Sequence, residues 1–389
     1  MIPSLDLVAL VIFVFVQWRI TVMWLRLAGR RFSGRTRTAA RYAVFLLDIL
    51  LAEGYAFDFV ALLVRRPVVA GPFARVMSAA ALLYLITATL VFTLYTLLQA
   101  VRQRFDAPLD PGRRRALNAV GNALVASPLA VMGYGALVER ASFRVREIDV
   151  PLAGLPRDLE GLRLLHLSDI HLSAFLSEAE FARVIDAALE TRPHLALVTG
   201  DLISSPGDPL DACIRQLARL KTDAGTFGCM GNHERYAGAE DYTAAACARA
   251  GMPFLRGQAR QLRFGSALVN LAGVDYQSLL HRDRYLPGAE RLVAPGALNI
   301  LLSHNPDVFP VAARQGYNLL LAGHTHGGQV QVEILEQSIN PARALTPYVY
   351  GLYRAGASAA YVTRGIGTIG IPARIGAPPE ISVLRLRKA

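Results

Sequence analysis

The chain has 389 residues, of which 53% are hydrophobic, and a formal net charge of +11. This length allows two or more domains, and the apolar content exceeds that of an ordinary soluble enzyme, so part of the chain is expected to lie in a membrane. Residues 1–138 hold 15 arginines and 6 acidic residues, whereas the rest of the chain is nearly neutral. A globular part that binds nucleic acid is therefore not expected.

Four apolar runs in the first third of the chain predict membrane-spanning helices. They cover about 5–25, 42–64, 76–101 and 116–138. A cleaved signal peptide is the alternative for the first run, but no positively charged region precedes it and no small-residue cleavage site follows it. Asp48, Glu53 and Asp58 interrupt the second run, either as functional groups facing a bundle interior or as structural ion pairs with nearby arginines. The sequence thus predicts a transmembrane helical domain over residues 1–139.

The loops between these runs predict the orientation of the chain. They contain six, three and five arginines in turn, and loops rich in arginine tend to remain in the cytoplasm. Loops one and three are therefore expected inside, and four spans then place the following domain outside. The alternative is that the run 116–138, with its Asn, Pro and Gly residues, forms a surface helix and leaves that domain in the cytoplasm. We expect a multi-pass protein of the plasma (inner) membrane with an extracytoplasmic domain.

From Leu162 onward, short apolar strands alternate with helices, which is typical of a layered α/β domain. Ser177 and Glu180 predict a capping box at the start of an amphipathic helix. Ligands of open α/β sheets bind beyond the carboxyl ends of the strands, so residues at these ends are the candidates for a site. Strands are predicted at 162–167, 195–199, 226–230, 298–303 and 318–322.

Five polar motifs each follow the end of one predicted strand. The segment GHTHGGQ contains two histidines one residue apart between glycines, a pattern that packing does not explain. The glycines let both imidazoles turn toward one point. Imidazoles together with carboxylates are the usual ligands of a two-metal hydrolytic site. The alternative for this heptapeptide alone is a glycine-rich hairpin with hydrogen-bonded histidines. In chain order the motifs are SDIH (Asp169, His171), TGD (Asp201), GNHE (Asn232, His233), SHNP (His304) and GHTHGGQ (His324, His326).

This ordered set resembles the calcineurin-like metallophosphoesterase superfamily, and in particular its membrane-associated branch of transmembrane proteins with a metallophosphoesterase domain. The resemblance implies a four-layer α/β sandwich over residues 140–389, with two mixed β-sheets flanked by helices. It also implies two divalent metal ions, which are Mn, Fe or Zn, with Asp201 shared between them. The implied ligands are Asp169, His171, Asp201 and His326 for one ion, and Asp201, Asn232, His304 and His324 for the other.

The same resemblance implies the catalytic roles. A hydroxide bridging the two ions attacks phosphorus, and His233 protonates the leaving oxygen or steadies the transition state. Asp201 and His233 are therefore the expected catalytic residues, the alternative for His233 being a structural histidine. Arg364 and Arg374 are candidate substrate contacts because guanidinium groups suit phosphate, and Tyr236 is a third because it follows GNHE.

The sequence thus predicts a membrane-anchored, metal-dependent phosphohydrolase that cleaves a phosphomonoester, phosphodiester or pyrophosphate bond of a lipid-linked substrate. Its expected partners are the bilayer and this substrate, with no nucleic acid. One alternative is a membrane sensor or scaffold that has lost activity, against which the complete ligand set argues. A second is a nuclease or nucleotide phosphodiesterase of the same fold, against which the near-neutral charge of the domain argues.

Overall fold

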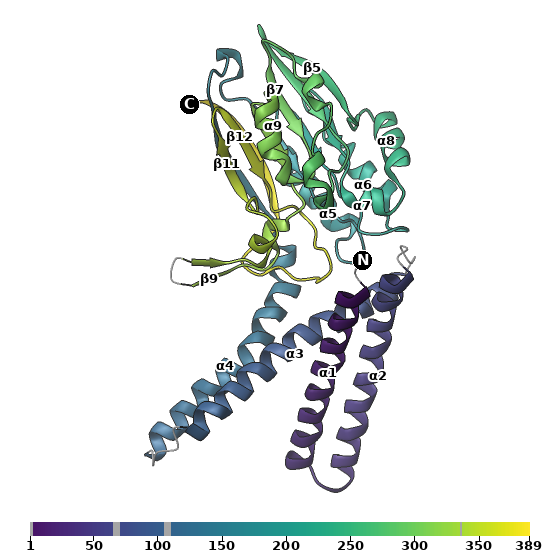
Figure 1. Ribbon diagram of the computed structural model, residues 1–389, viewed down its shortest axis with the longest axis vertical. Helices are drawn as coiled ribbons and strands as arrows, with labels where there is room; N and C mark the ends of the chain where they lie inside the picture. Colours follow the sequence, from purple (N-terminus) through teal and green to yellow (C-terminus); the bar gives the residue numbers. More distant parts are fainter. Residues whose placement is uncertain (1–2, 65–70, 105–109, 335–336) are drawn as a thin grey trace. The chain divides into compact units, whose positions relative to one another are not determined.

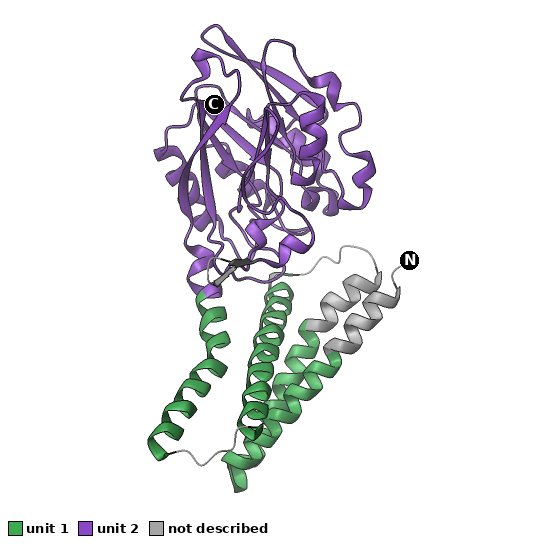
Figure 2. Ribbon diagram, turned by 60° about the vertical axis from the view of Figure 1, so that its left-hand side comes forward, with its two compact units in different colours: residues 1–134 green, residues 135–389 purple. Residues whose placement is uncertain are grey.

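The computed structural model describes residues 3–64, 71–104, 110–334 and 337–389, with side chains for 14–54, 71, 73–104, 110–331 and 340–389. The chain divides into two compact units, residues 1–134 and 135–389 (Figure 2).

The first unit is built from long helices (Figure 1). The first three pack against one another, with Ile20, Leu85 and Ala88 forming a small buried cluster. α2 and α3 approach closely at Gly54, where an added Cβ would lie 2.8 Å from the carbonyl oxygen of Met77. The helices are α1 (Pro3–Arg31), α2 (Gly34–Val64), α3 (Pro72–Arg104) and α4 (Pro111–Leu137).

Two of these helices, within 73–104 and 111–141, are long and apolar enough to cross a membrane, judged by length and composition among the described residues. The prediction of four spans is therefore supported for 76–101 and 116–138 but not for 5–25 and 42–64. The described part of α1 carries Arg19, and α2 is interrupted by Asp48 and Glu53. Both runs also extend into residues whose side chains are not described, 5–13 and 55–64.

Asp48 has uncharged partners. Its carboxylate accepts hydrogen bonds from Gln17 Nε2 at 2.8 Å and from Thr21 Oγ1 at 2.9 Å, both on α1. Among the described residues, this acidic group therefore joins α2 to α1 through neutral donors, and the arginine ion pair that the sequence suggested as one alternative is not seen there. Asp58 lies outside the residues whose side chains are described.

The second unit contains two mixed sheets (Figure 1). In the first, the order is β1-β13-β2-β3-β4, with β13 antiparallel to β2 and the other neighbours parallel. In the second, the order is β11-β12-β8-β7-β6-β5, with antiparallel pairs at both edges. β9 (Val332–Ile334) and β10 (Gln337–Ile339) form a separate antiparallel pair. The strands of the first sheet are β1 (Arg144–Leu152), β2 (Arg163–Leu167), β3 (Leu195–Thr199), β4 (Thr226–Cys229) and β13 (Glu380–Lys388). Those of the second are β5 (Gln258–Phe264), β6 (Ala267–Gly273), β7 (Leu298–Leu302), β8 (Leu319–Ala322), β11 (Gly351–Ala355) and β12 (Ser358–Val362).

Three apolar clusters hold these layers together. Inward-facing residues of both sheets, such as Leu197 of β3 and Ile300 of β7, form the central cluster. The outer face of the first sheet is covered by α5 (Glu178–Glu190), α6 (Leu210–Leu217) and α8 (Glu240–Arg249). The outer face of the second packs against α9 (Phe309–Gln315). The predicted sandwich of two mixed sheets flanked by helices is therefore confirmed, because alternate residues of each strand face opposite layers.

Local signals in the sequence account for the start of α5. Ser177 Oγ accepts a hydrogen bond from the backbone N–H of Glu180, and the Glu180 carboxylate accepts one from the backbone N–H of Ser177. This is the predicted capping box. The helix begins directly after the first polar motif, so the cap also fixes the end of the loop that carries Asp169 and His171.

Candidate metal centre

The five polar motifs lie beyond the carboxyl ends of β2, β3, β4, β7 and β8. β2, β3 and β4 are mutually parallel in one sheet, and β7 and β8 are parallel in the other. Their carboxyl ends therefore meet at one edge of the sandwich, as expected for a ligand site in an α/β fold. The short helix α7 (Asn232–Tyr236) begins in the third motif and presents Asn232 and His233.

The predicted ligands converge at this edge in overlapping clusters. Ligand atoms within 4.8 Å of one another form the groups Asp169–His171–His326, His171–Asp201–His233 and Asp201–His304–His324. The Nε2 atoms of His171 and His326 are 3.2 Å apart. Oδ2 of Asp201 lies 3.0 Å from Nε2 of His304 and 3.5 Å from Nε2 of His171. Asp201 thus stands between the two predicted ligand sets.

The backbone at this edge is strained. Among the described residues other than glycine, few have a positive φ, and five of them are predicted ligands. Residues with a side chain rarely adopt this conformation, and such strain clusters at functional sites. The φ angles are 51° for Asp169, 50° for His171, 55° for Asp201, 72° for His324 and 53° for His326.

Two glycines let the loops approach the carboxylates. A Cβ added to Gly231 would lie 2.1 Å from Oδ1 of Asp201, and one added to Gly323 would lie 2.2 Å from Oδ2 of Asp169. Neither position has room for a side chain. The glycines of GNHE and GHTHGGQ therefore serve the close packing of ligand loops, in addition to turning the chain.

Hydrogen bonds fix the orientation of the imidazoles. Nδ1 of His304 lies 2.6 Å from the carbonyl oxygen of Thr199. A carbonyl oxygen only accepts, so Nδ1 carries the proton and Nε2 faces the centre. Nδ1 of His171 similarly lies 3.1 Å from Oγ of Ser204. The Oδ1 atom of Asn232 is buried and has no hydrogen-bond partner among the described residues.

Burial also sets the ionisation of the site. It lowers the pKa of His171 and of His324 to about 3, so both imidazoles are neutral at neutral pH, the form that binds a metal ion. Burial opposes ionisation of Asp201, but the charges of His304, His233 and His171 and the hydrogen bond from His304 together outweigh it and hold the pKa of Asp201 well below its usual range. The donor set therefore combines imidazole nitrogens, the carboxylates of Asp169 and Asp201, and an unpaired amide oxygen, which suits a divalent transition metal.

Glu234 supports the centre without facing it. Its buried carboxylate accepts hydrogen bonds from the backbone N–H groups of Asp201 at 3.0 Å, Leu202 at 2.6 Å and Gly231 at 2.8 Å. It therefore ties the TGD loop to the GNHE loop. The sequence shows an acidic residue after GNH but gives no indication of this role, since the three donors are backbone atoms of separate segments.

His233 and Tyr236 lie at the mouth of the site. Nδ1 of His233 is 2.6 Å from the carbonyl oxygen of Ser204, which leaves Nε2 free. The ring of Tyr236 is 56% exposed and its centroid is 5.6 Å from that of His233. Both residues are therefore placed where a substrate could reach them.

The two predicted arginine contacts differ. Arg364 is half-buried beside Gly327, and its guanidinium lies 4.0 Å from the ring centroid of Tyr350. Arg374 is fully buried and donates only to backbone carbonyls, among them Ala377 at 2.9 Å and Arg364 at 2.9 Å. The prediction that Arg374 contacts substrate is therefore corrected. Its guanidinium group is occupied by hydrogen bonds that hold the carboxyl-terminal segment beside the GHTHGGQ loop.

Tyr276 is a residue of this site that the sequence did not indicate. Its buried ring has its centroid 5.5 Å from that of His324 and 6.1 Å from that of His304. It follows β6, which is parallel to β7 and ends at the same edge. The sequence pattern did not predict a strand at 267–273. A strand predicted there would have placed Tyr276 just beyond its carboxyl end, at the same sheet edge as the metal centre.

Comparisons with known proteins agree with this arrangement. The calcineurin-like phosphoesterase family matches residues 162–328. The uncharacterized metallophosphoesterase YkuE of Bacillus subtilis is 30% identical over 282 residues, covering 71% of this chain and 97% of that protein. The phosphodiesterase YaeI of Escherichia coli is 30% identical over 278 residues, covering 70% and 98%.

A zebrafish transmembrane protein with metallophosphoesterase domain is also similar, at 30% identity over 281 residues. The match covers 68% of this chain and 62% of the zebrafish protein. The chain belongs to the calcineurin-like phosphoesterase family and is a metal-dependent phosphoesterase.

Proposed function

We propose that this protein is a membrane-anchored phosphohydrolase with two metal ions that cleaves a phosphomonoester, phosphodiester or pyrophosphate bond of a lipid-linked substrate. The observation that carries the proposal is the position of Asp201, which belongs to the clusters on both sides of the centre. One ion would be held by Asp169, His171, Asp201 and His326, and the other by Asp201, Asn232, His304 and His324. The ions, when bound, supply Lewis acidity toward a phosphoryl oxygen.

The chain's own residues supply the rest of the chemistry. Asp169 and Asp201 provide negative charge for the ions, and the neutral imidazoles of His171 and His324 add ligands without adding charge. His233 has its Nδ1 proton directed to the Ser204 carbonyl, so Nε2 is the atom that would take up a second proton and, as the imidazolium, pass it to the leaving oxygen. Arg364 and Tyr236 are the substrate contacts that we propose at the mouth, for a phosphate oxygen and for the leaving group respectively.

Three observations support a lipid-linked substrate. Two helices have the length and composition of membrane spans, and a similar zebrafish protein is named as a transmembrane protein. A domain tethered to the bilayer meets a membrane-confined substrate at a higher effective concentration than a free domain would. The 26 basic and 24 acidic residues after residue 138 give no strong attraction to nucleic acid.

The test uses the full chain in bilayers, stripped of metal and supplied with Mn, Fe(II) or Zn in turn. We expect hydrolysis of lipid phosphates, lipid pyrophosphates or lipid phosphodiesters, followed by the phosphate or the phosphomonoester and alcohol that each reaction releases, to exceed hydrolysis of nucleotides. Asp201→Asn should retain fewer than two ions and lose activity by about a thousandfold, since several kcal/mol of transition-state stabilisation depend on the ions. Asp149→Asn, which alters an exposed carboxylate paired with Arg385, is the matched control.

Normal turnover and full metal content in Asp201→Asn would refute the two-metal site. Equal or faster hydrolysis of nucleotides would refute the lipid-linked substrate while leaving the metal chemistry in place.

We also propose that α1 to α4 all cross the plasma membrane and that the catalytic unit lies on the extracytoplasmic side, which rests on the arginine pattern of the loops. Reporter fusions after Arg140 test this. An alkaline phosphatase fusion should be active and a green fluorescent protein fusion dark. The opposite pair of results would place the catalytic unit in the cytoplasm.

A further inference from the structure

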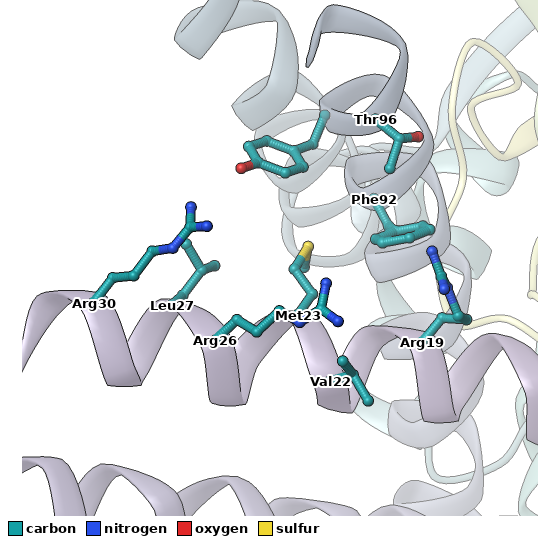
Figure 3. Close-up of a pocket in the computed structure, with 9 residues that line it drawn as sticks. Arg19, Val22, Met23, Arg26, Leu27, Arg30, Phe92 and Thr96 are labelled. Carbon is teal, nitrogen blue, oxygen red and sulfur yellow. The ribbon is translucent and has the colours of Figure 1, made fainter. Parts of the chain in front are cut away.

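A pocket of about 170 Å³ lies in the first unit between α1 and α3 (Figure 3). Its charged wall is formed by Arg19, Arg26 and Arg30 of α1, which project from the side of the helix that faces α3. The opposite wall is formed by half-buried residues of α3, which are Phe92, Tyr95 and Thr96. This pocket belongs to neither the catalytic unit nor the proposed reaction.

The three arginines share one face of α1. Their spacing of seven and four residues returns to nearly the same direction on a helix of 3.6 residues per turn. Three positive charges are thus held along about 16 Å of helix, at a rise of about 1.5 Å per residue. These three positive charges repel one another unless anions lie beside them.

The chain does not neutralise this row among the residues that the structure describes. The ion pairs of the described residues do not include Arg19, Arg26 or Arg30, and Asp48 on α2 is engaged by Gln17 and Thr21. The recorded partner of Arg19 is the ring of Phe92, whose centroid is 5.7 Å from the guanidinium carbon. Within the part of the chain whose side chains are described, the charges of the pocket are therefore available to a ligand.

The other side chains of the pocket indicate what kind of anion would fit. Guanidinium groups bind phosphate through paired N–H donors. Met23 and Leu27 lie between the arginines along α1, and Phe92 faces them from α3. A free phosphate ion would leave this apolar surface uncovered. The hydrocarbon attached to a lipid phosphate would pack against it. Arg30 lies in the last turn of α1, where arginine commonly reaches the headgroup level of a bilayer.

We propose that this pocket binds the phosphate headgroup of an anionic phospholipid. Basic pockets between helices near a membrane surface bind anionic headgroups by the same combination of charge and apolar contact. The site is separate from the catalytic centre, so the inference does not depend on the substrate proposed above.

The chain contains a reporter for this pocket. Trp18 and Trp24 are its two tryptophans, and both lie on α1 next to pocket residues. We would reconstitute the full chain in phosphatidylcholine nanodiscs and titrate spin-labelled phosphatidylglycerol or spin-labelled phosphatidylcholine. Preferential occupation of the pocket should quench tryptophan fluorescence at a lower fraction of the anionic lipid than of the neutral lipid.

The decisive comparison uses two triple variants with the same loss of charge. Arg19→Gln/Arg26→Gln/Arg30→Gln should lower the preference for the anionic lipid by about tenfold or more. Arg113→Gln/Arg114→Gln/Arg115→Gln, at the exposed start of α4, should leave it nearly unchanged. Equal losses in the two variants would show diffuse attraction by surface charge and would overturn the proposal. No preference in the unaltered protein, as expected if the pocket pairs with carboxylates of another protein, would also overturn it.

Two further arms separate binding from other causes. The variant with Lys at the same three positions keeps the charge and should retain most of the preference. Complete loss of the preference in the Lys variant, with unchanged helical circular dichroism, would show that positive charge in the pocket does not select the anionic lipid and would overturn the proposal. Glycerol 3-phosphate and inorganic phosphate should compete only weakly. Displacement of the labelled lipid by either at equal concentration would assign the pocket to a soluble phosphate.

Discussion

The backbone N–H of His233 donates a hydrogen bond to Oδ1 of Asp201 at 2.9 Å, while the His233 side chain is held by the carbonyl of Ser204. The imidazole is therefore positioned by the same loop that carries the shared carboxylate. This arrangement allows His233 to act on a substrate without being required as a metal ligand.

The first prediction separates the role of His233 as an acid from a role as a ligand. His233→Ala should keep both metal ions and slow hydrolysis of alkyl phosphates by about 100-fold, with a smaller loss on nitrophenyl phosphate, whose leaving group needs no proton. Metal content and turnover on the two substrates check this. His281→Ala, at an exposed histidine, is the control. Equal losses on both substrates would exclude the acid role, and loss of an ion would make His233 a ligand.

The second prediction concerns Glu234. Glu234→Gln replaces one acceptor oxygen by an N–H₂ group that faces backbone donors, so the loops carrying Asp201 and Asn232 should separate. We expect metal affinity to fall by about 10- to 100-fold, as when other residues that support ligands are changed. Metal titration of the stripped protein measures this, with Glu178→Gln on the exposed side of α5 as the control. Unchanged affinity would show that the carboxylate contributes only to folding.

The third prediction follows from the burial of Arg374. Arg374→Met should remove the donors of several buried carbonyls and lower the free energy of unfolding of the second unit by about 3 kcal/mol. Cys213, Cys229 and Cys247 are buried in this unit, so thiol labelling during denaturant titration reports its unfolding. Arg249→Met, at an exposed arginine, should change the midpoint little. If Arg374 instead contacted substrate, its variant would raise KM and leave the unfolding midpoint unchanged.

The fourth prediction concerns acid sensitivity. His166 is fully buried, its Nε2 lies 2.8 Å from Oγ1 of Thr199, and burial lowers its pKa to about 3. In the unfolded chain the pKa of histidine is about 6.5. Between about pH 6.5 and about pH 3, this histidine is therefore protonated in the unfolded state but neutral in the folded state. Stability is therefore complete above about pH 6.5 and is lost toward pH 3, by up to about 1.4 kcal/mol per pH unit from this residue.

His166→Gln should flatten this dependence, because glutamine stays neutral throughout. Labelling of the buried cysteines with 4,4′-dithiodipyridine, which reacts in acid, would follow unfolding at about pH 7 and about pH 5. His281→Gln should keep the dependence of the unaltered protein. An unchanged pH dependence in His166→Gln would show that other groups cause the acid sensitivity.

The sequence by itself determined the family and the layered α/β domain, because the information was local. Each polar motif follows an apolar strand, and the parallel arrangement of such strands brings their ends together. The predicted strands agree with β2, β3, β4, β7 and β8 to within a residue or two at each end. The capping box of Ser177 and Glu180 was readable for the same reason, since its partners are three residues apart.

The roles of residues whose partners are distant in the chain could be assigned only from the tertiary structure. Arg374 was mistaken for a substrate contact because nothing in its neighbourhood shows that it is enclosed by backbone carbonyls. Tyr276 was missed because its strand had not been recognised, and Glu234 because its three donors are backbone groups. In the sequence, Arg26 and Arg30 only count toward the six arginines of the first loop, and the packing of α1 against α3 is what places Phe92 opposite Arg19. Local hydrogen bonds and strand ends are encoded by neighbouring residues, whereas burial and charge pairing are properties of the assembled layers.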